Sequence, residues 1–208
     1  TAPQLIEGQN KNTGVRIALK YFSPNLYSEM QKKFKQQQIS RSLVMFAELK
    51  HRNLIHYHET ISNEKGVFIV MDWCILRSFH DLREDFAGKE ISEKLLVKYV
   101  FDVLNGLEFL HQQGVAHSNL RASNILLTDK ESKLTDFGFS ALYSNSTIES
   151  HPYWSAPETL TTNNFTKESD IWSLGCTIIE MLTGKPPWSD LDPEQAMNKI
   201  KSKEIFRN

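Results

Sequence analysis

The sequence predicts an α+β fold in which a small β-rich part precedes a larger helical part. Residues 15–22 are β-branched and aromatic and follow a turn-like polar run, which indicates the second strand of a hairpin. Residues 67–71 form a continuous apolar run of strand length. Beyond them the apolar residues recur at helical spacing, which predicts a boundary between the two parts within residues 72–77.

One helix is expected on each side of that boundary. Residues 28–49 begin polar and then carry an apolar stripe at Leu43, Phe46 and Leu49, which favours one helix. A longer helix is expected from an N-cap at Ser92 to the glycine signal at Gly114. Its apolar residues keep a helical period, at Leu96, Tyr99, Val100, Val103, Leu104, Leu107 and Leu110.

The remaining part of the chain predicts a short hairpin and a buried helix. Residues 124–127 and 132–135 are short enough to pair as small strands around the polar residues 128–131. Residues 171–182 are apolar nearly all round, which predicts a buried helix that ends at Gly184.

Composition limits the kinds of binding partner and the cellular compartment that we expect. The 208 residues are 40% hydrophobic and 24% charged, which is ordinary for a globular protein. A net charge of -1 provides no broad basic field for nucleic acid, and no apolar run is long enough to cross a bilayer. We therefore expect a protein or small molecule as partner. Cys74 and Cys176 are far apart and lack metal-ligand spacing, so we expect a reducing, cytoplasmic location.

Four segments in the second half of the chain follow one another in an informative order. Residues 117–124 read His-Ser-Asn-Leu-Arg-Ala-Ser-Asn, and Asp-Phe-Gly follows at 136–138. Residues 151–158 read His-Pro-Tyr-Trp-Ser-Ala-Pro-Glu, and residues 170–176 read Asp-Ile-Trp-Ser-Leu-Gly-Cys. Together these segments resemble the catalytic loop, the metal-binding motif, the end of the activation segment and the central helix of the protein kinase family.

The resemblance covers nearly the whole chain and rests on landmarks in a fixed order: Lys20, His51, Asn124, Asp136, Glu158 and Asp170. The motif sequences are most similar to those of MAP kinase kinase kinases and related serine/threonine kinases, although residues 121–123 are nearer to the tyrosine-kinase motif. The resemblance implies a two-lobe kinase-like fold with a partial N-lobe at 1–74 and a partial C-lobe at 75–208, which together make one kinase domain truncated at both ends.

The resemblance also assigns a nucleotide site. Lys20 falls where a strand lysine meets the α- and β-phosphates, and small Ala18 leaves room for adenine, with Leu126 on its other side. Taken alone, a lysine at a strand end is ordinarily a solvated charge. The same resemblance adds three further cofactor-binding positions, at Met71, Asp72 and Cys74.

Asn124 and Asp136 fall where kinases hold magnesium against the nucleotide phosphates. An isolated Asp-Phe-Gly would merely be a turn, but its place after a loop that ends in Asn124 favours the metal site.

The chain departs from the family pattern at several positions. Asn119 replaces the aspartate that accepts the substrate hydroxyl's proton, and a carboxamide has no basic site at neutral pH. Ser42 falls where a glutamate would pair with Lys20, and Ser118 where an arginine would clamp a phosphorylated loop. His151 replaces a threonine.

Two further comparisons with the family concern the ends of the chain and its core. Glycine-rich Gly-x-Gly-x-x-Gly does not occur, and the arginine that would pair with Glu158 is absent from the sequence. One group of residues falls where kinases stack a column that links the lobes, although a ligand-free hydrophobic core would explain them equally well: Phe46, Tyr57, His117 and Phe137, anchored on Asp170.

The sequence therefore favours a pseudokinase domain whose catalytic positions are a degenerate Asn119 and Arg121. It would be catalytically deficient, with ATP and Mg²⁺ still able to bind weakly, and would regulate or scaffold a partner kinase in signalling. A weakly active serine/threonine kinase is the alternative, because loss of a general base costs about 10²–10⁴-fold rather than everything. A structural lobe that binds no nucleotide is the third possibility.

Overall fold

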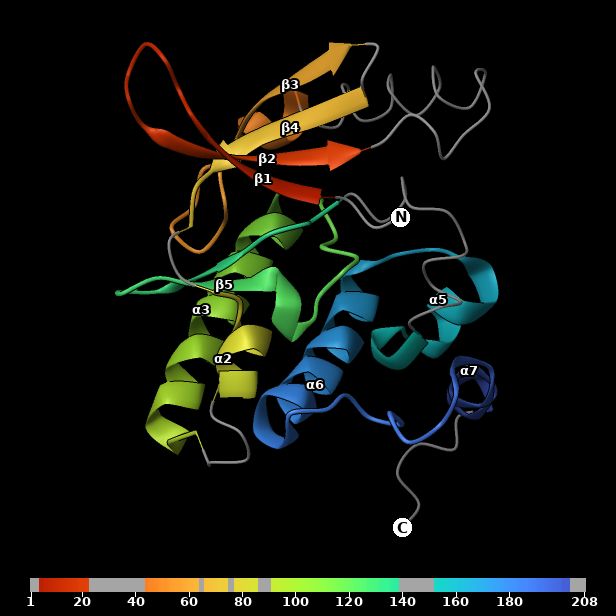
Figure 1. The fold of residues 1–208 in the computed structure, drawn as a ribbon. Helices are drawn as coiled ribbons and strands as arrows, with labels where there is room; N and C mark the ends of the chain where they lie inside the picture. Colours follow the sequence, from red (N-terminus) through yellow and green to blue (C-terminus); the bar gives the residue numbers. More distant parts are fainter. Residues whose placement is uncertain are drawn as a thin grey trace. The chain divides into compact units, whose positions relative to one another are not determined.

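The computed structural model describes residues 4–22, 44–63, 66–74, 77–85, 91–138 and 152–202. The chain divides into two compact units, Thr1–Ile75 and Leu76–Asn208. The first unit contains a β-sheet and the second is mainly helical, so the predicted α+β class is confirmed (Figure 1).

The first unit is built on one antiparallel sheet of four strands in the order β1-β2-β4-β3 (Figure 1). The predicted hairpin is present as β1 and β2, and the apolar run 67–71 lies within β4. Gly14 has a φ of 70°, and its N–H donates to the Asn10 carbonyl at 2.8 Å, which closes the hairpin turn. The strands are β1 (Gln4–Gln9), β2 (Arg16–Phe22), β3 (Tyr57–Asn63) and β4 (Gly66–Asp72).

The helix expected over residues 28–49 is described only at its end. Residues 44–47 are helical, and Phe46 and Leu49 are buried as the apolar stripe predicts. Leu43 and Ser42 lie outside the described residues.

The second unit is mainly helical and contains a small two-stranded hairpin at its edge (Figure 1). The predicted short strands are present as β5 and β6, which pair antiparallel. The elements are α2 (Phe79–Asp85), α3 (Glu93–Gln112), the 3₁₀ turn η2 (Ala122–Asn124), β5 (Ile125–Leu127), β6 (Ser132–Leu134), the 3₁₀ turn η4 (Pro152–Trp154), α5 (Pro157–Thr162), α6 (Lys167–Thr183) and α7 (Pro193–Lys201).

Both predicted ends of helix α3 are confirmed. The Ser92 side chain accepts a hydrogen bond from the Leu95 N–H, and Gly114 follows the helix with a φ of 77°. The apolar stripe is buried at Leu96, Val103, Leu107 and Leu110, whereas Leu104 is exposed.

Helix α6 is only partly the all-round buried helix that its composition predicts. It begins with a capping box at Thr166 and ends at Gly184, as expected. However, Ile171 and Leu182 are more than half exposed. The face that packs inward repeats every three to four residues, through Asp170, Leu174, Thr177 and Met181, so Ile171 and Leu182 fall outside this face.

Cys176 is a buried thiol of helix α6. Burial raises the pKa of the Cys176 thiol to about 12, so this cysteine stays protonated and unreactive at neutral pH.

Among the helices of the described ranges, none combines the length and apolar character that a membrane crossing requires.

Candidate functional site

The segment that begins at His117 is anchored on a buried carboxylate of helix α6. Asp170 is fully buried, and its Oδ2 accepts from the His117 N–H at 2.7 Å and lies 2.7 Å from His111 Nε2. Its Oδ1 accepts from the Ser118 N–H at 2.8 Å. Hydrogen bonds to an ionised acceptor are stronger than neutral ones, so Asp170 fixes the backbone at which the loop starts.

Ser118 adopts a left-handed backbone conformation, with a φ of 67°. This region costs a non-glycine residue about 1–2 kcal/mol, and the bond from its N–H to Asp170 helps to hold it there. The Ser118 hydroxyl donates to the Ala116 carbonyl at 3.2 Å. The side chain at this position is therefore uncharged and is turned onto its own loop, where an arginine would reach out to a phosphate.

His117 joins the loop to the segment that contains Asp136. Its ring packs edge-on against Phe137 with centroids 6.3 Å apart, and its carbonyl accepts from the Gly138 N–H at 2.9 Å. Its Nδ1 accepts from the Asn119 N–H at 3.2 Å. Burial lowers the pKa of His117, and the nearby charges of Asp170 and Asp136 offset that effect only in part. The imidazole is therefore neutral at pH 7.

We expect the stability of the protein to fall as the pH drops below about 6.5, because the unfolded His117 accepts a proton more readily than the buried one. Stability is fully present above the unfolded pKa and is lost below it, by at most about 1.4 kcal/mol per pH unit for each such group. Urea unfolding at pH 7.5, 6.5 and 5.5 measures this. His117→Phe should give a flatter profile; an unchanged slope would show that His117 is not the titrating group.

Asn119 is held in place by both of its backbone groups. Its N–H donates to His117 Nδ1, and its carbonyl accepts from Asn124 Nδ2 at 2.7 Å. The backbone at the base position is thus well fixed, and the departure from the family pattern concerns the side chain alone. The bond also orients buried Asn124, whose amide oxygen lies on the other side of the group from the donating nitrogen.

Asn124 and Asp136 are brought together at one end of the β5–β6 hairpin. Ile125 pairs with Leu134, and the Thr135 N–H donates to the Asn124 carbonyl at 3.0 Å. Asp136 has a φ of 63°, a conformation that aspartate tolerates better than most residues. The two side chains therefore leave the chain on either side of one short backbone bridge.

A carboxylate and an amide oxygen at this bridge are hard donors that fit Mg²⁺. Magnesium usually takes one or two protein ligands and completes its octahedron with phosphates and water. Within the described ranges, no group of three or more His, Cys, Asp or Glu side chains could hold a metal ion. Two protein ligands such as Asn124 and Asp136 would leave the remaining positions of the octahedron to phosphates and water.

Arg121 is placed against an aromatic ring. Its Cζ lies 5.8 Å from the centre of the Trp154 ring, within the range of a cation–π contact. Its Nε is buried and has no hydrogen-bond partner among the described residues. The Trp154 indole donates to Glu180 Oε2 at 2.9 Å, and the Ala122 N–H donates to the same oxygen at 3.0 Å.

Glu180 is a buried carboxylate beside the loop that the sequence reasoning missed. It connects the loop after Arg121 to the segment that contains Trp154. His80 Nδ1 lies 3.6 Å from its other oxygen. A lone acid within an apolar helical run was the available signal, because a buried charge requires partners.

The predicted cofactor residues of the first unit mostly share one face of its sheet. Ala18 lies directly opposite Met71, both are buried, and Lys20 follows two residues after Ala18 on the same side of β2. A small residue at Ala18 beside a strand lysine is compatible with a flat ring on this face.

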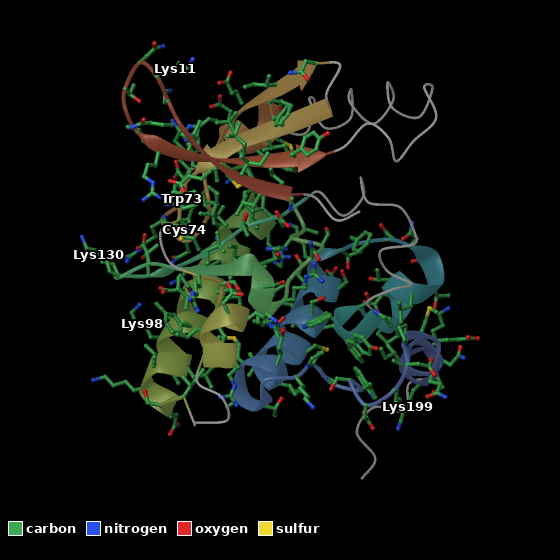
Figure 2. The ribbon with its side chains drawn as sticks, in the orientation of Figure 1. Lys11, Trp73, Cys74, Lys98, Lys130 and Lys199 are labelled. Carbon is green, nitrogen blue, oxygen red and sulfur yellow. The ribbon has the colours of Figure 1, made fainter. Side chains whose placement is uncertain are left out.

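Asp72 points to the other face of that sheet, opposite Ile17. Its carboxylate lies 2.9 Å from His58 Nε2, so this side chain is on the face away from Ala18 and Met71. Trp73 and half-buried Cys74 follow β4 (Figure 2). The Arg16 guanidinium lies 4.9 Å from the centre of the Trp73 ring.

The other predicted residues are placed as follows. Leu126 is half-buried in β5 and forms a backbone bridge with Ser78 in the second unit. Glu158 is exposed in the first turn of α5, where an acid suits the helix dipole and needs no buried partner. His151 and Ser42 lie outside the described residues. Phe46 and Tyr57 are buried in the first unit.

Comparison with known proteins agrees with this arrangement. The family model described as protein kinase domain matches residues 3–208. Cell division control protein 7 of Schizosaccharomyces pombe is 38% identical over 167 residues, which are 78% of this chain and 15% of that protein. Cytokinesis protein sepH of Emericella nidulans is 36% identical over 196 residues, 92% of this chain and 14% of that protein.

A plant protein also matches most of this chain. Mitogen-activated protein kinase kinase kinase 3 of Arabidopsis thaliana is 31% identical over 193 residues, which are 88% of this chain and 29% of that protein. The chain thus spans less than a third of the length of each of these three relatives.

Proposed function

The chain belongs to the protein kinase family, and we propose that within this family it is a pseudokinase domain, which binds a nucleotide with Mg²⁺ but transfers phosphate poorly. The observation that carries the proposal is the loop around Asn119. Its backbone is held by His117 and Asn124, so a side chain without basicity occupies the base position.

The metal-binding half of the machinery is retained. The Asn124 amide oxygen and the Asp136 carboxylate are the groups that would hold Mg²⁺, at the end of the β5–β6 hairpin where Thr135 ties the two positions together. When bound, the metal would neutralise charge on the nucleotide phosphates. Lys20 and the face formed by Ala18 and Met71 would bind the phosphates and the adenine ring.

The catalytic half is deficient at several positions. Asn119 cannot accept a proton from a substrate hydroxyl. Ser118 provides no guanidinium to order a phosphorylated loop, and its hydroxyl is bonded to Ala116. Ser42 stands where the family pattern has a glutamate. Losses in different parts of the machinery support a domain that no longer depends on catalysis.

Nucleotide binding is tested by thermal unfolding and calorimetry with ATP, with and without Mg²⁺. We expect Mg²⁺–ATP to stabilise the protein, by about 2.7 kcal/mol when the ligand is at 100 times its Kd. Asp136→Ala should lose this stabilisation, because the site then keeps a single metal ligand. Asp129→Ala, which removes an exposed acid at the turn of the same hairpin, serves as the matched control.

Two outcomes would count against nucleotide binding. If millimolar Mg²⁺–ATP leaves the wild-type unfolding temperature unchanged, the domain is a structural lobe that binds no nucleotide. If Asp136→Ala is stabilised as much as the wild type, the ligand binds elsewhere.

A slow serine/threonine kinase is the second candidate function. The observation that favours it is that the Thr135 N–H, bonded to the Asn124 carbonyl, keeps Asn124 and Asp136 at one end of the hairpin, and relatives named as protein kinases add to it. Phosphoryl transfer depends chiefly on positioning and charge stabilisation, which this arrangement would retain. Phosphotransfer by Asn119 variants separates the two candidates.

The proposed role is the regulation or scaffolding of a partner kinase in cytoplasmic signalling. A domain that binds nucleotide without turnover can still hold a defined conformation for a partner. We expect the purified protein to change the rate of a kinase that binds it, in the Asp136→Ala form less than in the wild type.

A further inference from the structure

The β5–β6 hairpin carries both proposed metal ligands at one end, while helix α3 holds its other end. Asn124 directly precedes β5, and Asp136 follows β6 by two residues. The strands are three residues long, and a two-stranded hairpin is marginal without support. Its position must therefore be set by the elements that flank it.

One carboxylate of α3 holds the start of β6. Asp102 is buried, and its Oδ2 accepts from the Ser132 N–H at 2.9 Å. Lys98, one helical turn earlier, has its Nζ 3.5 Å from the same oxygen and donates to the Lys130 carbonyl at 2.7 Å. Figure 2 shows Lys98 on α3 and Lys130 at the tip of the hairpin on the same side of the unit.

This clamp, formed by Asp102 and Lys98, acts on β6 from the side opposite β5. Strand β5 has its own attachment, since the Leu127 N–H donates to the Arg77 carbonyl at 3.1 Å. The two strands are thus tied to different parts of the unit, and their relative position decides where Asn124 and Asp136 lie. A hydrogen bond to a carboxylate is roughly twice as strong as a neutral one, so the bond from Ser132 to Asp102 is a substantial support of β6 beside its pairing with β5.

We propose that Asp102, assisted by Lys98, is a positioning residue that sets the separation of Asn124 and Asp136 and thereby the affinity for a metal–nucleotide complex. The inference rests on the proposed nucleotide function. Asp102 contacts neither the metal nor the nucleotide; it acts through Ser132 and the pairing of β6 with β5.

Electron paramagnetic resonance with Mn²⁺ as the probe measures this effect. For Asp102→Ala we expect about 10-fold weaker binding of Mn²⁺–ATP, the size seen when supports behind metal ligands are removed. Binding of ATP without metal, in the presence of a chelator, should change by about 2-fold or less, because the sheet of the first unit is untouched. Glu108→Ala, an exposed acid on the same helix, should match the wild type.

Conservative variants keep the test valid if Asp102→Ala does not fold. Asp102→Asn retains an oxygen that can accept from Ser132, so it should bind Mn²⁺–ATP within about 3-fold of the wild type. Lys98→Met removes the ammonium but leaves the bond to Ser132, and it should weaken binding by about 3-fold. Equal weakening of Mn²⁺–ATP and metal-free ATP would mean a purely structural role and would overturn the inference.

Amide hydrogen exchange gives a readout that does not require nucleotide. The Thr135 N–H, which donates to Asn124, should exchange faster in Asp102→Ala, or in Asp102→Asn to a smaller extent, while amides of α7 stay unchanged. If the wild type binds no Mn²⁺–ATP, the proposed function fails, and the inferred effect on metal affinity fails with it. Unchanged exchange at Thr135 would overturn the positioning role by itself.

Discussion

Replacing Asn119 by aspartate is expected to raise the rate of phosphoryl transfer by about 10²–10⁴-fold, the usual contribution of a general base. The new carboxylate would stand on a backbone that is already fixed, because the Asn119 N–H and carbonyl are bonded to His117 and Asn124. No rearrangement of the loop is therefore needed. Transfer of labelled phosphate from ATP to a protein substrate, with the full-length protein, measures the rate.

Two control variants define the result. Asn119→Ala also lacks a base and should match the wild type, whereas Asp136→Ala sets the background without metal binding. If Asn119→Asp is no faster than Asn119→Ala, the missing base does not limit transfer. If the wild type already exceeds the Asp136→Ala background by several orders of magnitude, the protein is an active kinase.

Removing the buried carboxylate of Asp170 is expected to lower the free energy of unfolding by about 3–5 kcal/mol, the cost of breaking a buried charged network. Asp170→Ala leaves the N–H groups of His117 and Ser118 and the His111 ring without their acceptor. It also removes the bond that holds Ser118 in its left-handed conformation. Urea unfolding at pH 7.5 measures the loss.

An exposed acid gives the matched comparison for Asp170. Asp190→Ala should change the free energy of unfolding by about 0.5 kcal/mol or less, as surface substitutions usually do. A loss below about 1 kcal/mol for Asp170→Ala would contradict the anchoring role, because even one unsatisfied buried donor costs more.

Elements with local signals could be predicted from the sequence. The Ser92 cap, the glycine end at Gly184 and the hairpin before β2 each depend on residues within one turn of the chain. Such signals act through neighbouring backbone groups, so they do not depend on the rest of the fold.

Features that depend on distant partners could not be predicted. Ser118 is left-handed although nothing in its own sequence favours that conformation; a carboxylate 52 residues away imposes it. The contact of Arg121 with Trp154 depends on how η4 packs, which no local pattern reveals. The pairing of Asp102 with Ser132 joins two elements whose contact the helical pattern of α3 does not reveal.

The proximity of Asn124 and Asp136 could be predicted, because motifs in the same order as in a known family indicate the same fold. The order of Asn124 and Asp136 implied a shared site, and the bridge from Thr135 places them at one hairpin end. Exposure of Ile171 and Leu182 was missed because apolar composition does not state which helix face meets the core.

The central claim is that the domain keeps nucleotide and metal binding while it has lost proton transfer from the substrate. An isotope-trapping measurement tests both halves together: labelled ATP is bound with Mg²⁺ and protein substrate, then chased with excess unlabelled ATP. We predict that the bound ATP dissociates intact in the wild type and is partly transferred in Asn119→Asp. Transfer of the bound phosphate by the wild type before dissociation would contradict the account, as would the absence of any bound ATP.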